Sequence, residues 1–184
     1  MDNIMKHNET KILSNIIFSI AVPATKNKFV AKNKFVVDTN EWTKIKIFKM
    51  NDNFVAWFGE KVEDPFPGSF ISVRNIVAKT FDGRISRELF NSDDLIETTL
   101  AEIYFFMKYR ISGEAGTFFD TIWSNIFFVR DVNDKLRTIN FFWNSDGEYS
   151  EGWSIHATEF GSLSAGQWSV GNRVFYHNTF NYSG

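Results

Sequence analysis

The sequence predicts an α+β fold, built mostly of antiparallel β-strands with one amphipathic helix around residues 92–111. Twenty-one Phe, six Trp and five Tyr bring the aromatic content to 17%, and aromatic and β-branched residues favour strands. Runs with strand-like alternation follow one another between short turns. One segment alone repeats its apolar residues at helical spacing. We therefore expect about nine strands arranged as a curved sheet, a sandwich or an open barrel.

Length and composition indicate an ordinary globular protein. The chain has 184 residues, of which 43% are hydrophobic and 23% charged, and a chain of this size can bury a substantial core. The strongest break, at residues 64–68, is a turn rather than a linker, so residues 1–184 are expected to form a single domain. The absence of Cys excludes disulfides and thiol chemistry and favours a cytoplasmic location.

The first apolar segment, residues 12–22, has two interpretations. Its length suits the hydrophobic part of a signal sequence. Ser14, Asn15 and Ser19 interrupt it, which favours a first buried strand. It is shorter than the roughly 20 apolar residues that a membrane span requires, so no membrane span is expected.

Most of the remaining chain is predicted as strands. The runs are 28–37, 42–50, 54–60, 69–79, 122–130, 136–143, 153–160 and 168–177. Asn51, Asp52 and Asn53 are interpreted as a tight hairpin turn between two of them. The last four runs are predicted to form an antiparallel meander, because short turn-forming segments join them.

The predicted helix follows the polar residues 91–94, which can cap its first N–H groups. Apolar residues then recur at intervals of three and four. The side chains expected to be buried against the sheet are Ile96, Leu100, Ile103 and Met107.

Charge is unevenly distributed along the chain. Residues 1–50 carry nine Lys and four acidic residues, and a short tandem repeat holds Lys26, Lys28, Lys32 and Lys34. These four lysines are predicted to contact an acidic protein partner. The alternatives are an edge strand protected by lysine, a nucleic acid, which we favour less, and a homo-oligomer in which unlike halves of two copies attract each other.

Patterns typical of catalysis are missing from the sequence. With no Cys and three His, neither a thiolate nor a His-rich metal site can be assembled. Gly161 and Gly166 have the spacing of a phosphate-binding loop, but Gln167 stands where that loop needs Lys. Asp146, Glu148 and Glu151 are interpreted as a solvated loop rather than a calcium site. We expect no catalytic residue, no metal and no cofactor.

Alternation in the final strands predicts a polar row. Pairing Trp143 with Trp153 places Asn140 opposite His156, and matching polar faces in the next hairpin places Arg173 beside His156. An amide, an imidazole and a guanidinium could bind an anion, a sugar hydroxyl or a partner carboxylate. The alternative is that the row is merely the solvated face of the sheet.

These observations favour a non-enzymatic binding protein that acts through a protein–protein interface, such as an accessory or inhibitor protein of a bacterium or phage. Aromatic residues and Arg often dominate interface energies. One alternative is a β-sandwich that binds carbohydrate or lipid, as toxin-like modules do; it needs exposed Trp or Tyr for stacking. A less favoured alternative is an enzyme that uses only Asp, Glu or His.

Overall fold

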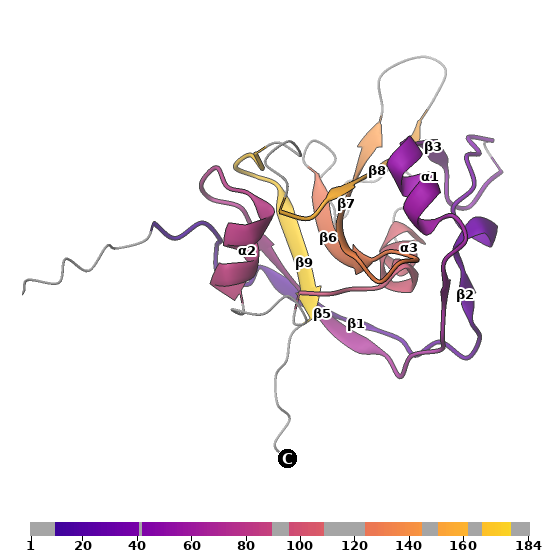
Figure 1. Ribbon diagram of the computed structural model, residues 1–184, viewed down its shortest axis with the longest axis horizontal. Coiled ribbons are helices and arrows are strands. Elements are labelled where there is room, and N and C mark those ends of the chain that lie inside the picture. Colours follow the sequence, from indigo (N-terminus) through magenta and orange to yellow (C-terminus); the bar gives the residue numbers. More distant parts are fainter. Residues whose placement is uncertain are drawn as a thin grey trace, which may run out of the picture.

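The computed structural model describes residues 10–40, 42–89, 96–108, 124–144, 151–161 and 167–177. These residues form an α+β fold with one open seven-stranded sheet and a separate two-stranded sheet (Figure 1), which confirms the predicted class. The strands are β1 (Phe18–Val22), β2 (Phe29–Val30), β3 (Ile47–Met50), β4 (Val62–Glu63), β5 (Ser69–Asn75), β6 (Asn125–Arg130), β7 (Leu136–Asn144), β8 (Gly152–Glu159) and β9 (Arg173–His177). The helices are the 3₁₀ turn η1 (Ala31–Asn33) and the α-helices α1 (Asp52–Phe58), α2 (Asp82–Leu89) and α3 (Leu100–Lys108).

The large sheet has the strand order β1-β5-β9-β6-β7-β8-β3. Its pairs are antiparallel except β6 with β9 and β3 with β8, which run parallel. The predicted meander is confirmed for β6, β7 and β8, including the pairing of Trp143 with Trp153. The position of the last strand was predicted wrongly. β9 lies between β5 and β6, because β3 occupies the outer edge of β8.

Both faces of the sheet are buried, so it forms the middle layer. On one face, Phe127 stacks on Phe175 with 4.5 Å between ring centroids, and Phe106 of α3 packs 5.3 Å from Phe175. On the other face, Ile126 joins a second apolar cluster with Ile85 of α2. Side chains therefore alternate between two cores along β6.

A helix lies within the predicted range, and the four apolar residues predicted to be buried are confirmed as buried, although Ile96 precedes the helix. Ile96, Leu100, Ile103 and Met107 have no exposed surface. The described helix begins later than expected, at Leu100, because Thr99 hydrogen-bonds both the carboxylate and the backbone N–H of Glu102, as in a capping box. The preceding residues are extended and carry Ile96 into the core on the opposite sheet face. Residues 92–95 and 109–111 lie outside the described part of the chain.

Two strand predictions in the first half are wrong. Residues 54–60 belong largely to α1, and Asn51 is its N-cap rather than a hairpin residue, since its side chain accepts a hydrogen bond from the N–H of Phe54. In residues 28–37 the strand is limited to Phe29–Val30, after which the chain turns into η1. Helix α2 was not predicted.

The first apolar segment contains a strand, as predicted. β1 pairs antiparallel with β5, and Leu13 forms an isolated bridge with Ile76. Within the described residues, no helix combines the length and the apolar character needed to cross a membrane.

Candidate binding surface

The predicted polar row forms only in part. Asn140 and His156 are directly opposed in the antiparallel pair of β7 and β8, as predicted. Arg173 is not beside them: it pairs with Asn125, and β6 and β7 separate its strand from β8. The prediction failed because it assumed that the last strand continues the meander.

Arg173 also lies on the other face of the sheet. It is two residues from Phe175, which packs in the core beneath α3, and residues two apart on a strand share a face. Asn140 is opposite Ile126, which belongs to the second core. Arg173 thus lies on one face of the sheet and Asn140 and His156 on the other. The three side chains cannot form one recognition site on the sheet.

His156 has a different cationic neighbour. It is half-buried, and its ring packs edge-on 5.6 Å from Phe142. Burial, with a smaller contribution from the charge of Lys49, lowers the pKa of His156 below its ordinary value. The amide of Asn140 donates to the hydroxyl of Ser124 at 3.3 Å. Asn140 and His156 thus form a small polar pair across β7 and β8.

The four predicted lysines lie together on another part of the molecule. Lys26, Lys28, Lys32 and Lys34 are all exposed around β2 and η1. Lys28 lies 3.1 Å from Asp64, and Lys32 lies 2.7 Å from Glu60. The ammonium of Lys34 lies 5.7 Å from the centre of the Tyr104 ring. The alternative that these lysines protect the edge of a long strand does not account for all four of them, because β2 has only two residues.

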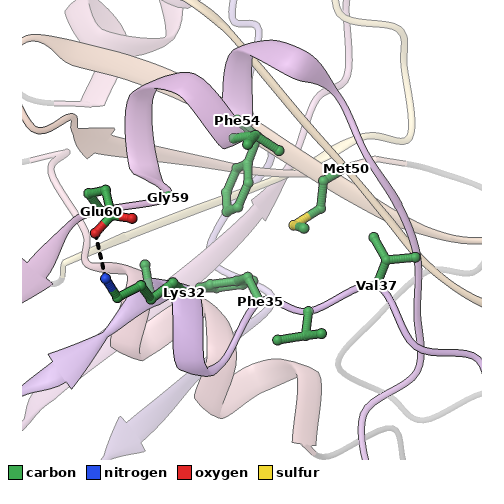
Figure 2. A pocket seen from close by; sticks show the side chains of 10 residues that line it. Lys32, Phe35, Val37, Met50, Phe54, Gly59 and Glu60 are labelled. Atoms are coloured by element: carbon green, nitrogen blue, oxygen red, sulfur yellow. Dashed lines mark hydrogen bonds and ion pairs between the residues drawn. The ribbon is translucent and has the colours of Figure 1, made fainter.

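An apolar pocket of about 430 Å³ opens between η1 and α1, and Lys32 is the lysine of this group that lines it. Figure 2 shows Phe54 and Phe35 facing each other across it, with the Lys32–Glu60 ion pair towards one end and Met50 and Val37 towards the other. The apolar side chains that line it are Ala31, Phe35, Val36, Val37, Met50, Phe54 and Val55. We call this site the valine pocket.

The valine pocket combines a fixed floor with an apolar rim. Phe35 and Phe54 are buried and pack edge to face, with 5.1 Å between their centroids. Val36, Val37 and Val55 remain 53%, 54% and 52% exposed. Large contiguous patches of exposed apolar side chains often mark interaction sites, and these three valines border one pocket.

A loop that follows Val37 adds an exposed Trp. Trp42 is 84% exposed, while the side chain of Asp38 shapes the loop by accepting hydrogen bonds from the backbone N–H of Asn40 and the hydroxyl of Thr43. Both hydrogen bonds lower the pKa of Asp38, and the bond from the backbone N–H of Asn40 has the larger effect. Trp residues are prominent among the residues that dominate interface energies.

The other Trp residues that the structure describes are buried or half-buried. Trp143, Trp153 and Trp168 are buried. Trp57 is half-buried, and the guanidinium of Arg137 lies 3.9 Å from the centre of its ring. Trp123 lies outside the described residues. The carbohydrate-binding alternative needs an exposed aromatic ring for stacking, and Trp42 is the described Trp residue that could provide one.

A buried carboxylate, that of Glu102, holds the start of α3. Glu102 accepts hydrogen bonds from Ser69, from the backbone N–H of Thr99 and from Nε2 of His177 at 2.8 Å. Burial opposes ionisation of Glu102, yet these bonds and the charge of His177 outweigh it and lower its pKa. The hydroxyl of Ser69 and Nε2 of His177 contact the same carboxylate oxygen, so Glu102 joins these two side chains.

Glu63 caps the same helix from the neighbouring sheet. Its two carboxylate oxygens accept hydrogen bonds from the backbone N–H groups of Leu100 and Ala101 at 2.8 and 2.9 Å. Burial raises its pKa despite these bonds. The two carboxylates therefore satisfy the free N–H groups at the start of α3.

Among the residues that the structure describes, no three His, Asp or Glu side chains are grouped so that they could hold a metal ion. Asp146 and Glu148 of the predicted solvated loop lie outside these residues, and Glu151 is exposed. Residues 162–166, which include Gly166, are also outside them.

Comparison with known proteins gives no match among family models, curated proteins or solved structures.

Sequence reasoning singled out Lys32 but missed the valine pocket that this residue lines. Residues 54–60 were predicted as a strand, which would point Phe54 and Val55 to opposite faces of a sheet. Asn51 followed by Asp52 and Asn53 is also a helix start signal, and that interpretation would have placed Val55 on a helix.

Proposed function

We propose that this chain is a non-enzymatic binding protein that acts through a protein–protein interface centred on the valine pocket. One observation supports this most directly. Three half-exposed valines surround an apolar pocket that Lys32 also lines, and the exposed Lys26, Lys28 and Lys34 lie close to Lys32 in the sequence. An accessory or inhibitor role remains our prediction for the biological setting.

The chemistry of the pocket defines the partner segment. Apolar side chains that enter the pocket would gain about 25 cal/mol for each Å² removed from water. The lysines favour carboxylates beside those apolar side chains and would speed their approach. We therefore expect an exposed peptide segment in which large apolar residues are flanked by Asp or Glu.

The lysines are available for such a partner at little cost. The side chains of Lys28 and Lys32 are 66% and 57% exposed, and those of their partners Asp64 and Glu60 are more exposed still. Exposed ion pairs of this kind contribute at most about 1 kcal/mol. A partner carboxylate can therefore replace Asp64 or Glu60 without a large loss of stability.

The test is binding of short peptides that combine apolar and acidic residues, selected from an array and then measured in solution by calorimetry. Val55→Asp should weaken binding of the selected peptide at least tenfold, because it places a carboxylate at the apolar rim where partner carboxylates approach. Val170→Asp is the matched control: Val170 is 51% exposed and does not line the pocket.

The control should bind within twofold of the unaltered protein. Two results would contradict the proposal. One is an equal loss in both variants, and the other is an array in which acidic apolar peptides bind no better than their amide counterparts. Circular dichroism of each variant verifies that it is folded.

A further inference from the structure

A second pocket, of about 410 Å³, lies far from the valine pocket along the sheet. It is lined by Thr10, Lys11, Arg74, Arg84, Arg87 and Glu88. Arg74 comes from β5, and Arg84 and Arg87 from α2. Figure 1 shows α2 beside β5 and β9, whereas α1 lies near β3 and β8 on the other side of the molecule. We call this site the arginine pocket.

The charges in the arginine pocket are not balanced. Four cationic side chains and one carboxylate line it. That carboxylate, of Glu88, is already engaged, since it accepts the backbone N–H groups of Ile12 and Leu13 at 2.8 and 3.0 Å. Among the described residues, no carboxylate lies within ion-pair distance of Arg74, Arg84 or Arg87. Cations placed so close together repel one another unless an anion joins them.

Two of the three guanidiniums, those of Arg74 and Arg84, are held by hydrogen bonds and retain further donors. Nε of Arg74 donates to the hydroxyl of Tyr176 at 2.8 Å. This bond fixes the side chain and leaves its two terminal amino groups to donate to a ligand. Arg84 donates one hydrogen bond to the carbonyl of Thr10 at 3.2 Å. Arg87, three residues further on the same helix face, is exposed and makes no hydrogen bond or ion pair with the described residues. Each guanidinium carries five N–H donors.

The pocket wall is also fixed before any ligand arrives. Glu88 anchors the segment at Ile12 and Leu13 to α2. Ile85 of α2 is buried in the core beneath. Donors that are already ordered lose less entropy on binding.

From this geometry we infer that the arginine pocket binds a small molecule through a phosphate or pyrophosphate group. Planar guanidiniums pair with phosphate oxygens through two parallel hydrogen bonds, and three of them converge here from two elements. The volume is in the range of small-molecule sites. This inference does not depend on the proposed function, because the two pockets share no residue.

The test is calorimetric titration of the full chain with inorganic phosphate, pyrophosphate and a sugar phosphate in parallel. At least one should bind saturably with one site, and comparing the three distinguishes a free phosphate from an organic ester. Arg87→Gln should weaken that binding about tenfold or more, as loss of a charge-assisted pair predicts. Arg87→Lys keeps the charge but loses the planar donor pair. Its affinity for the same ligand should therefore lie between that of the unaltered protein and that of Arg87→Gln.

Lys135→Gln is the control: it removes one positive charge from an exposed residue outside the pocket, and it should leave the affinity within twofold. Absence of saturable binding in all three titrations would overturn the inference. So would an equal loss in Lys135→Gln and Arg87→Gln, or binding of citrate as tight as that of the phosphates. Binding of a single-stranded oligonucleotide with none of the small phosphates would overturn it as well.

Discussion

Glu102 is the residue on which most polar contacts at the start of α3 converge. Its side chain is fully buried, and it accepts hydrogen bonds from Thr99, Ser69 and His177. A buried carboxylate is costly to hold in the charged form unless donors surround it. The set of donors here keeps its pKa below the ordinary value of 4.5.

We expect Glu102→Gln to destabilise the protein by about 2 to 3 kcal/mol near neutral pH, because hydrogen bonds to a charged group are stronger than those to an amide. The folded-state pKa is lowered, so the stabilisation is present above the ordinary value of 4.5 and is lost as the pH falls through the folded-state value. The difference in unfolding free energy between the two proteins should therefore shrink in acid. Urea unfolding across this pH range measures it.

Glu159→Gln serves as the control, since the side chain of Glu159 is 67% exposed and its loss should cost less than about 0.5 kcal/mol. The raised pKa of Glu63 acts in the opposite direction, but it is present in both proteins and largely cancels in their difference. A Glu102→Gln effect that stays constant from neutral to acid pH would contradict this account of Glu102.

At the residue scale, the sequence was sufficient to predict cross-strand pairs that depend only on the alternation of side chains along neighbouring strands. The pairing of Asn140 with His156 followed from matching Trp143 with Trp153. Capping of α3 by Glu63 could not be predicted, because 37 positions in the sequence separate Glu63 from Leu100. The convergence of Arg74 with Arg84 and Arg87 likewise depends on how α2 packs against the sheet.

At the element scale, α1 is the element on which the valine pocket depends. Helix α1 has seven residues, which are too few for a helix to be stable alone in water. Its stability must therefore come from the contacts of its buried face and from the capping of its ends. Phe54 and Phe58 are buried. Asn51 accepts hydrogen bonds from the N–H groups of Phe54 and Ala157 at 2.9 and 3.0 Å, and it donates to the carbonyl of Ala157 at 3.0 Å.

Asn51→Ala should therefore destabilise the protein by about 2 to 4 kcal/mol, because it removes an N-cap and both bonds to β8. Asn53→Ala is the matched control two residues away. Asn53 makes one long hydrogen bond of 3.3 Å to the carbonyl of Ala157, so its loss should cost less than about 1 kcal/mol. Equal unfolding free energies for the two variants in urea would contradict the capping role of Asn51.

Elements with a clear periodic pattern were predicted and short ones were not. β7 and β8 are long enough for alternation to show, and the apolar spacing of α3 identified its buried side. α1 was assigned to the wrong class because alternation and helical spacing cannot be distinguished over so few residues. β2 has two residues, and its partner β4 is not visible as an alternating run.

At the scale of the whole molecule, the uneven charge distribution has a measurable consequence. The affinity of a selected acidic peptide for the valine pocket should fall steeply with added salt, because exposed charges are screened over about 10 Å at 0.1 M. Lys28→Gln and Lys32→Gln should each reduce that salt dependence, while Lys135→Gln should not. Equal affinity at low and high salt would reject a role for the lysines.

Topology was the least predictable property of the molecule. The meander of β6 to β8 follows from short turns, but β9 passes to the other side of β6 and pairs with it in parallel. The parallel pairing of β3 with β8 joins segments about 100 residues apart in the sequence, and no local signal encodes such a contact.

The most direct test of the proposed function is a methyl NMR titration of the full chain with the selected peptide. The account predicts that the methyl resonances of Val36, Val37 and Val55 shift progressively with peptide concentration. The exposed valines away from the pocket, Val77, Val132 and Val170, should not shift. Saturable shifts at these three, with none at Val36, Val37 and Val55, would contradict a protein-binding role for the valine pocket.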